Sequence, residues 1–379
     1  MVATCFPDIL PDECILSAVA RYKHRLMFFS SSKIFEICTF KAKGHFRHDL
    51  PTFLGSLAQS LPNQDLYTID YLIDKCTLFP YYRPFLPQER QERLRQSMRA
   101  NDASAILDSA GIRQRKVPVV GWLRYCPECF MSDCQRYGEP YWHRLHQIRG
   151  VEVCPEHRVF LQNSTAPLRL ATTKTRLLAA EELCHEWPRI GQRIDDSDMD
   201  HQVLLRLAQD AQWLLAQTEL KDGPEAIVAR FRMLFIDRGM ATKLHHKIQN
   251  QKILADLSHY YSPALLRLLN CELPEKAQQN WLSVVLRGSW HASDPIRFLL
   301  LIQYLEHSAE SFFRLPDKYH PKPFGDGPWP CLNPVCSNHQ ESVIHSVTLS
   351  KGNNPPRLRG DFACHCGFVY RYSRDVSQE

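Results

Sequence analysis

Two pairs of metal-binding residue types stand close together near the middle of the chain. Cys126 and Cys129 form one pair, Cys154 and His157 form the other, and two residues separate the members of each pair. This spacing lets each pair hold a metal from a tight turn, and two such turns complete a tetrahedral shell around Zn²⁺. The pattern therefore predicts a zinc site. A nucleophilic Cys/His pair would leave the repeated spacing unexplained, and Cys134, which has no paired spacing, is not expected to be a ligand.

A second group of cysteines stands near the C-terminal end of the sequence. Its four members have spacings typical of a zinc ribbon, and they are Cys331, Cys336, Cys364 and Cys366. Gly367 follows the last of them, where the lack of a side chain relieves crowding as backbone amides turn toward a thiolate. The alternating residues 367–372 predict a strand of that ribbon. Two nearby histidines, His339 and His365, are competing ligand candidates.

Each group offers four ligands, which is the number that a closed, structural zinc site uses. A catalytic zinc ion keeps one position open for water and usually has three protein ligands. The sequence also lacks a His-x-Glu ahead of a cysteine pair, as deaminases have, and a carboxylate set suited to a two-metal nuclease. We therefore predict two structural Zn²⁺ ions and no enzymatic activity.

The composition is typical of a mildly basic cytoplasmic protein. The chain has 379 residues, a formal net charge of +5 and 14 cysteines. Its first residues do not resemble a secretory signal, and no apolar run approaches the ~20 residues that a membrane helix needs, so no membrane partner is expected. In a reducing compartment, clustered cysteines indicate metal binding. The scattered cysteines are expected to be small buried side chains: Cys5, Cys14, Cys38, Cys76, Cys184 and Cys271.

Helical patterns dominate the stretches on either side of the first cysteine group. We predict a mainly α fold with small zinc-stabilised α+β modules. Its four domains are an N-terminal helical domain at 1–115, a first zinc-binding module at 116–170, a helical domain at 171–315 and a second zinc-ribbon module at 316–379. The first domain is expected to hold helices at 11–26, 64–78 and 87–107. The third of these is rich in arginine, which indicates either a solvated face with internal ion pairs or a phosphate-contacting face.

The second helical domain contains a candidate helix-turn-helix. Apolar stripes predict helices at about 203–223, 227–239 and 242–258. Two helices that a short, glycine-containing turn joins have the layout of a helix-turn-helix, although helical hairpins are also common packing units. Basic residues of the second helix are candidate DNA contacts: Lys243, His245, His246 and Lys247. The zinc ribbon adds Arg357, Arg359 and Arg371, for which a solvated surface is the alternative.

Several further motifs extend over most of the chain. They are Pro11-x-Glu13 with Leu16, Ser17 and Arg21; Thr77-Leu-Phe-Pro80 with Tyr82; Leu123-Arg-Tyr-Cys126-Pro-Glu-Cys129; Trp142; Cys154-Pro-Glu-His157; Asn280-Trp-Leu282; and Phe362-x-Cys364-x-Cys366-Gly-Phe-Val-Tyr370. Together they resemble the TniQ/TnsD family of transposon target-selection proteins. The resemblance implies recognition of a chromosomal attachment site in double-stranded DNA, or docking on a guide-RNA effector complex. It also implies recruitment of the AAA+ ATPase TnsC, with the N-terminal helices as the surface that faces the ATPase.

Two functions therefore remain open. One is a TnsD-like selector that binds duplex DNA directly, and the other is a TniQ-type adaptor that links an RNA-guided CRISPR effector complex to the ATPase. The second cysteine group and the TnsD-like motifs favour the first, and a zinc-containing transcription regulator is a further alternative. TnsD-like chains generally continue past the second ribbon into more DNA-binding helices, whereas this sequence stops at Glu379. We therefore expect incomplete attachment-site binding and an intact recruiting surface.

Overall fold

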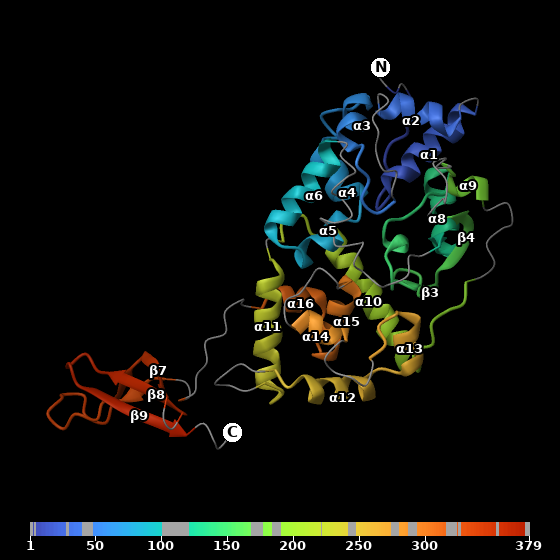
Figure 1. Ribbon diagram of the computed structural model, residues 1–379. Helices are drawn as coiled ribbons and strands as arrows, with labels where there is room; N and C mark the ends of the chain where they lie inside the picture. Colours follow the sequence, from blue (N-terminus) through green and yellow to red (C-terminus); the bar gives the residue numbers. More distant parts are fainter. Residues whose placement is uncertain are drawn as a thin grey trace. The chain divides into compact units, whose positions relative to one another are not determined.

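Helices dominate the computed structural model, and short antiparallel sheets accompany both cysteine groups (Figure 1). The structure describes residues 3, 5–27, 30–39, 48–100, 121–167, 177–183, 191–220, 222–241, 248–273, 280–286, 294–315, 324, 327–353 and 356–375. The chain forms two compact units, of which unit 1 comprises Met1–Val228 with Asn250–Asp317 and unit 2 comprises Ala229–Gln249 with Lys318–Glu379. The predicted domain boundaries near residues 115, 170 and 315 fall in or beside stretches outside this description, so they stay predictions.

The N-terminal part of unit 1 consists of short helices that share an apolar core. They are α1 (Ile15–Leu26), α2 (Ser31–Thr39), α3 (Leu54–Ser60), α4 (Ile69–Cys76), α5 (Phe79–Tyr82), the 3-10 helix η1 (Arg83–Phe85) and α6 (Gln88–Ala100). α1 begins later than predicted because Asp12 has a φ of 57°, which a right-handed helix excludes. α4 is shorter than the predicted 64–78 because Thr68 caps it, with its hydroxyl accepting the Tyr71 N–H at 3.2 Å.

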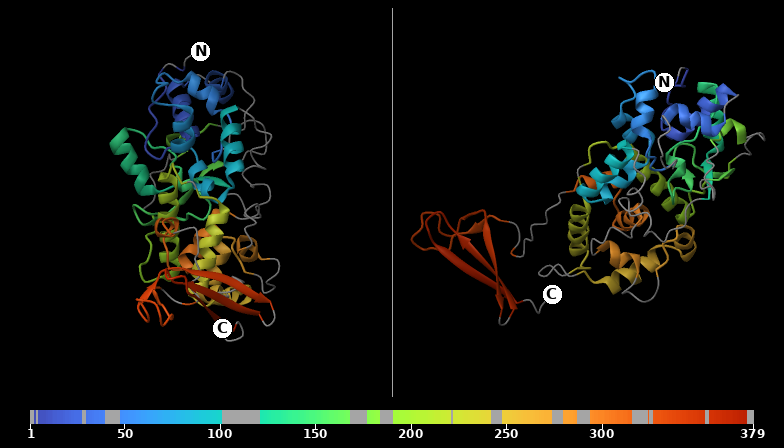
Figure 2. Two further views of the ribbon diagram at one scale, coloured as in Figure 1. Left: turned by 90° about the vertical axis from the view of Figure 1, so that its left-hand side faces the viewer. Right: turned by 45° about the horizontal axis from the view of Figure 1, so that its top comes forward.

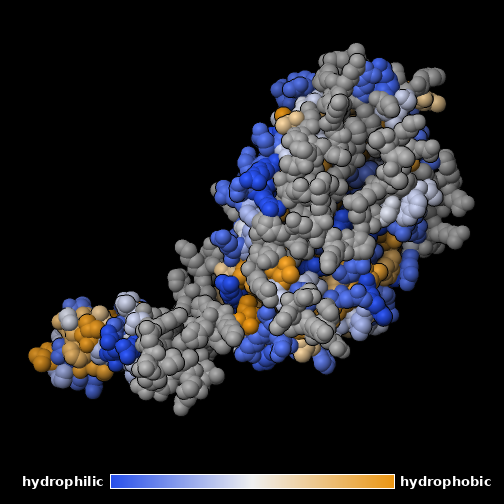
Figure 3. Space-filling model, in the orientation of Figure 1, coloured by the Kyte–Doolittle hydropathy of each residue, from blue (hydrophilic) through white to orange (hydrophobic). Residues whose placement is uncertain are grey.

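Helix α6 packs against α3 and α4 through a close backbone approach and ion pairs. A Cβ atom at Gly55 of α3 would lie 2.1 Å from the carbonyl oxygen of Arg99, so only glycine allows this approach. Arg95 pairs with Asp70 at 2.5 Å and with Asp74 at 2.6 Å, and Arg99 also pairs with Asp70. Two arginines of α6 are therefore held by α4, and Figure 3 shows hydrophilic side chains along the helix. This arrangement supports the ion-paired alternative for the arginine-rich helix.

Short strands surround the first cysteine group. The elements of this region are β1 (Trp122–Tyr125), α8 (Pro127–Tyr137), the 3-10 helix η2 (Leu145–Gln147), β2 (Val153–Cys154), β3 (Val159–Phe160), β4 (Gln162–Pro167) and α9 (Ala180–Leu183). β1 pairs with β4 and β2 pairs with β3, both antiparallel. Since β1 leads directly into Cys126 and β2 ends at Cys154, these pairings position both halves of the predicted metal site.

One long helix, α10 (Met199–Ala216), connects the parts of unit 1. It contacts α5, α15 and α16 as well as β2 and η2 of the cysteine region (Figure 1). Asp198 caps its first turn by accepting the N–H groups of Asp200 and His201. The helix ends at Ala216 and not at the predicted residue 223, because the Arg83 guanidinium binds the carbonyls of the extended residues Gln217, at 3.2 Å, and Thr218.

The remaining helices are α11 (Pro224–Asp237), α12 (Asn250–Tyr260), α13 (Pro263–Leu268), α14 (Trp281–Leu286), α15 (Pro295–Tyr304) and α16 (Ala309–Phe313). α11 ends as predicted before Gly239, whose φ of 65° breaks a helix. Within the described part of the predicted helix at 242–258, α12 begins at Asn250, because Ile248 bridges Ala241; residues 242–247, where the prediction starts, lie outside the described residues. The candidate helix-turn-helix includes these residues, so it stays a prediction. Among the described residues, no helix is both long and apolar enough to cross a membrane.

Unit 2 contains the strands around the second cysteine group, drawn in red in Figure 2. They are β5 (Trp329–Pro330), β6 (Ser342–Ile344), β7 (Val347–Asn353), β8 (Pro356–Ala363) and β9 (Val369–Asp375). β5 pairs with β6, and β7, β8 and β9 form a three-stranded antiparallel sheet. Phe362 is buried among the cysteines, and its ring stacks on Tyr370 with centroids 4.9 Å apart. The predicted strand at 367–372 is confirmed, but it begins two residues later because Gly367 forms the preceding turn with a φ of 85°.

Candidate metal centres

The first centre is assembled from a helix start and a hairpin. Cys126 is the N-cap of α8, its Sγ accepts the Cys129 N–H at 3.4 Å, and Pro127 occupies the first turn. The sequence Cys-Pro-Glu-Cys is therefore both a ligand pair and a helix start. On the other side, Cys154 ends β2, and its carbonyl accepts the Arg158 N–H at 2.9 Å, which closes the turn that contains the second pair.

The four donor atoms of this centre have the separations of a tetrahedral metal shell. His157 Nδ1 lies 3.6 Å from the Sγ of Cys126, 3.2 Å from that of Cys129 and 3.7 Å from that of Cys154. The Sγ atoms of Cys129 and Cys154 are 3.7 Å apart. Zn²⁺ with bonds of about 2.3 Å to sulfur and about 2.0 Å to nitrogen places its ligands about 3.5–3.8 Å apart. The donor set and its size both fit a divalent ion.

Burial and charge at this centre favour a bound cation. Cys126, Cys129 and Cys154 are all buried. Hydrogen bonds from the thiols of Cys126 and Cys129 lower the pKa of the Cys154 thiol, while hydrogen bonding to Cys126 raises the pKa of Cys129. The Cys154 thiol therefore loses its proton first and the other thiols resist deprotonation, because three thiolates at this distance repel each other. A metal ion among them removes that repulsion, which is why metal binding at such sites releases protons.

The second centre is formed by two loops of unit 2. The Cys336 Sγ accepts the Asn338 N–H at 3.4 Å, so the loop after β5 turns its amides toward the sulfur. In the other loop, the Gly367 N–H donates to the Cys364 carbonyl at 2.9 Å, and the Cys364 N–H donates to the Phe368 carbonyl at 2.9 Å. These bonds close the turn between β8 and β9, as the glycine after the last cysteine predicts.

The sulfur atoms of the second centre lie close together. The Sγ atoms of Cys331 and Cys366 are 3.9 Å apart, and all four cysteine sulfurs lie within 4.8 Å of one another. Tetrahedral Zn²⁺ requires sulfur atoms about 3.8 Å apart. Hydrogen bonds from the Phe368 backbone amide and the Asn333 side chain lower the pKa of Cys366 to about 6, so this exposed sulfur is a thiolate at neutral pH. A thiolate is the form that binds a metal.

The structure brings together both sets of predicted ligands. Each set forms a group of donor atoms able to hold a metal ion, and Cys134, His339 and His365 lie outside both groups. His365 Nδ1 lies 3.5 Å from the Sγ of its neighbour Cys364. Of the scattered cysteines that the structure describes, Cys5 is exposed, and the buried ones are Cys14, Cys38, Cys76 and Cys271.

The predicted DNA contacts are described only in part. Lys243, His245, His246 and Lys247 lie outside the described residues, as does the side chain of Arg357. Arg371 of β9 stands opposite Asp361 of β8, and Arg359 stands two residues before Asp361, so all three share one face of the sheet. Arg371 binds the Asp361 carboxylate with two hydrogen bonds of 2.5 and 2.8 Å, which lower the pKa of Asp361. One of the two described arginines is therefore neutralised within the sheet.

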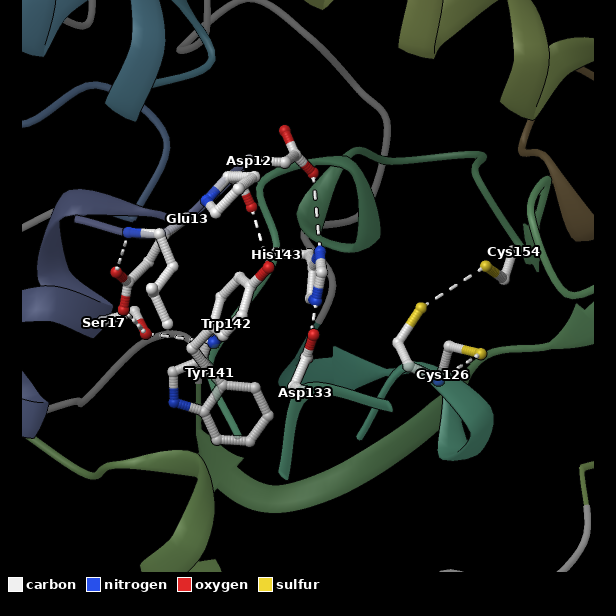
Figure 4. A network of polar contacts seen from close by, with 12 residues as sticks. Asp12, Glu13, Ser17, Cys126, Asp133, Tyr141, Trp142, His143 and Cys154 are labelled. Carbon is white, nitrogen blue, oxygen red and sulfur yellow. Dashed lines mark hydrogen bonds and ion pairs between the residues drawn. The ribbon is translucent and has the colours of Figure 1, made fainter. Parts of the chain in front are cut away.

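A buried polar network near the first centre was missed by the sequence analysis (Figure 4). The Ser17 hydroxyl donates to Glu13 Oε1 at 2.7 Å and accepts the Trp142 N–H at 3.0 Å. Arg21 Nη1 donates to Glu13 Oε2 at 2.9 Å, and burial raises the pKa of Glu13 although this cation opposes the change. Glu13, Ser17 and Arg21 recur every four positions, and apolar residues dominate the stretch between Cys14 and Tyr22. That polar stripe was the available signal of a buried partner.

A second branch of the network reaches the turn after α8. Asp12 accepts the Arg144 side chain and the Leu145 N–H, both at 3.1 Å. His143 Nε2 lies 2.8 Å from Asp133 Oδ2 of α8, and His143 Nδ1 lies 3.9 Å from Asp12 (Figure 4). Although burial opposes the charged ring, the hydrogen bond with Asp133 raises the pKa of His143. The segment that begins α1 is thus attached to the helix that carries half of the first centre.

Both candidate centres lie within stretches of the sequence that match models of known protein families. Residues 4–161, which include the first centre, match the family model described as TniQ. Residues 207–379, which include the second centre, match the model described as Tn7-like transposition protein D, TnsD. Transposon Tn7 transposition protein TnsD of Escherichia coli is 26% identical over 307 residues, which cover 80% of this chain and 56% of that protein. The chain therefore spans little more than half of this relative's length, and it belongs to the TniQ/TnsD family of transposition proteins.

Proposed function

We propose that this protein is a non-enzymatic selector of transposon insertion sites, which binds an attachment site in duplex DNA and recruits the AAA+ ATPase TnsC. The observation that carries the proposal is the presence of a TniQ match and a TnsD match in one chain, each of which contains one metal centre. The relative from Escherichia coli is itself named as a transposition protein. These comparisons do not favour the alternative in which the protein acts as an adaptor on a guide-RNA effector complex.

Both centres are proposed to hold Zn²⁺. One would have Cys126, Cys129, Cys154 and His157 as ligands, and the other Cys331, Cys336, Cys364 and Cys366. Thiolate-rich tetrahedral sets select Zn²⁺ over harder cations such as Mg²⁺, and four protein ligands leave no position for a reacting water. The ion would supply folding free energy, because chain segments that are far apart in the unfolded state become joined through it.

The proposed DNA surface lies on unit 2. Arg359 is half-buried and Arg371 is exposed on the same face of the sheet, where guanidinium groups can contact phosphates. The remaining candidates, Lys243, His245, His246, Lys247 and Arg357, are proposed from the sequence alone. The N-terminal helices of unit 1 are proposed to recruit the ATPase. Phosphate contacts of this kind contribute affinity for DNA, whereas its sequence would be recognised by several parts of the protein, each of which contributes weakly.

The test begins with the selection of DNA fragments from the host genome by the purified full chain, followed by sequencing. We expect enrichment of few loci, and affinity for the enriched duplex that falls steeply with salt yet exceeds that for a scrambled duplex. Arg359→Gln is expected to reduce the slope of log affinity against log salt by about 0.9. Arg314→Gln, which removes an exposed, ion-paired arginine of unit 1, is the matched control and should leave the slope unchanged.

Recruitment is tested by co-elution of purified TnsC with the protein on the enriched duplex. Absence of any preferred locus at low salt would refute direct selection of DNA. Association with a guide-RNA complex under those conditions would establish the adaptor function in its place. Binding of an operator without any association with the ATPase would identify a transcription regulator.

A further inference from the structure

A pocket of about 650 Å³ opens on unit 1, and its lining includes no residue of either candidate metal centre. It lies between α10, α15 and the turn that leads into α16. The residues that give it its chemistry are Arg206, Asp210, Trp213, Gln303, Glu306 and Glu310. Neither the proposed metal ions nor the proposed DNA surface involves these side chains.

The floor of the pocket contains a buried hydrogen-bond acceptor with nothing to accept. Asp210 Oδ1 accepts the Ala309 N–H at 2.7 Å, and Asp210 Oδ2 accepts the Gln303 Nε2–H at 3.3 Å. The second bond sets the orientation of the Gln303 amide, because reversing it would place two oxygens together. Gln303 is only 3% exposed, and among the described residues its Oε1 has no hydrogen-bond partner. A buried acceptor without a donor is costly, so this atom favours a ligand that brings an N–H group.

The charge of the walls indicates which donor the pocket favours. Of the three carboxylates of the lining, Glu310 pairs with Arg314, and the other two, Asp210 and Glu306, outnumber the one arginine, Arg206. Burial raises the pKa of Asp210 although the hydrogen bond from Ala309 opposes it, so a cation beside Asp210 would stabilise its charged form. The lining thus favours a cationic donor over an anionic or neutral one.

Trp213 gives the pocket an aromatic wall, which favours a guanidinium group among the possible cations. The half-buried Trp213 ring stacks on Phe313, with centroids 6.0 Å apart and planes inclined by 23°. Guanidinium groups lie flat against indole rings and are more weakly hydrated than ammonium groups, so they lose less on entering a half-enclosed site. Their several N–H donors also reach more than one acceptor at once.

We propose that this pocket binds the side chain of an arginine presented by a protein partner. The guanidinium would donate to Gln303 Oε1 and to the Asp210 carboxylate while lying along Trp213. Such a site is an anchor for a protruding residue at the centre of an interface, where arginine is common. It would provide a contact separate from the metal centres and from the arginines of unit 2.

The test uses the full chain labelled with 5-fluorotryptophan, observed by ¹⁹F NMR. Trp213→Phe identifies the resonance of interest among the 7 tryptophans. The probe is the capped tripeptide Gly-Arg-Gly, compared with the same peptide in which neutral citrulline replaces arginine. We expect a saturable shift of the Trp213 resonance with the arginine peptide only. Gln303→Leu should weaken this binding about tenfold or more, as for loss of a hydrogen bond to a charged donor.

Gln212→Leu makes the same chemical change at an exposed position of α10 outside the pocket, and it should bind the arginine peptide like the unchanged protein. The proposal is overturned if the resonance does not shift, or if it shifts equally with the citrulline peptide on the unchanged protein. These peptide comparisons do not depend on whether a variant folds. Binding of free arginine as tightly as the peptide would instead indicate a site for a small cation and would overturn the assignment to a protein partner.

Discussion

Replacing Ser17 by alanine should loosen the N-terminal helices far more than an ordinary serine substitution does. Within the described network, Ser17 Oγ of α1 is the only atom that joins Glu13 to the Trp142 backbone amide, through bonds of 2.7 and 3.0 Å. All three residues are at most 1% exposed, so water does not replace the hydroxyl. The variant keeps the shape of α1 but leaves one donor and one acceptor unsatisfied.

The expected cost follows from these two losses. A buried N–H without a partner costs about 1–3 kcal/mol, and a lost hydrogen bond to a charged group costs about 1.5–3 kcal/mol. Together they lower the local stability of α1 by about 2.5–6 kcal/mol. Because about 1.4 kcal/mol corresponds to a factor of ten, amide exchange in α1 should accelerate by about two to four powers of ten.

Native-state hydrogen exchange read by mass spectrometry is the appropriate assay, because it resolves α1 from the rest of a chain with two compact units. Ser258→Ala is the matched control. The Ser258 hydroxyl is exposed on α12 and donates to the carbonyl of Leu254 in its own helix at 2.8 Å, so its loss should matter little. Exchange in α1 of Ser17→Ala within tenfold of the unchanged protein would refute the reasoning.

Three further predictions concern the zinc content, the pH dependence of stability and the salt dependence of DNA binding. Elemental analysis of Cys154→Ser is expected to show one tightly bound zinc ion per chain, because only one of the two centres keeps four ligands. His143→Gln should lower the stability against urea more at about pH 6 than at about pH 9. The hydrogen bond with Asp133 raises the pKa of His143 despite burial, so its stabilisation is complete below the unfolded value and disappears as the pH rises through the folded value. Asp361→Asn should strengthen binding to duplex DNA in fluorescence anisotropy and steepen its salt dependence, because Arg371 loses its paired carboxylate.

The metal prediction has a matched control, and each of the three has an outcome that would contradict it. Cys134→Ser removes a nearby cysteine outside the centre and should retain both ions. Two ions in Cys154→Ser would show that its sulfur is not a ligand. An equal loss of stability for His143→Gln at both pH values would mean that the ring is not charged in the folded protein. An unchanged salt slope for Asp361→Asn would remove Arg371 from the proposed DNA surface.

The two groups of candidate metal ligands were predictable because the residues of such sites stand close together in the sequence. In the first centre, two residues separate the members of each pair. The four residues of each such segment form the turn that brings its two members together. The strand after Gly367 was predictable for the same reason, since alternation and a turn glycine are local features. The division into mostly helical stretches also followed from periodic apolar residues.

Features that depend on distant parts of the chain were not predictable in this way. The end of α10 is set by Arg83, which belongs to a different helix and binds the carbonyl groups after Ala216. The bridge between Ala241 and Ile248, which follow α11 and precede α12 in the sequence, is also not revealed by a helical period. Likewise, Glu13 and Ser17 were identifiable as motif residues, but their spacing does not show that Trp142 is the partner. Local patterns thus locate the ligands, and tertiary contacts decide what surrounds them.

The contact between Ser17 and Trp142 joins two parts of the chain that are synthesised at different times. Translation delivers α1 early, yet its serine must wait for a partner 125 residues further along the chain. By contrast, the first and last ligands of the first centre emerge within 31 residues of each other. Although nascent domains generally begin to fold from the N-terminal end, this hydrogen bond of α1 cannot form before residue 142 has been synthesised.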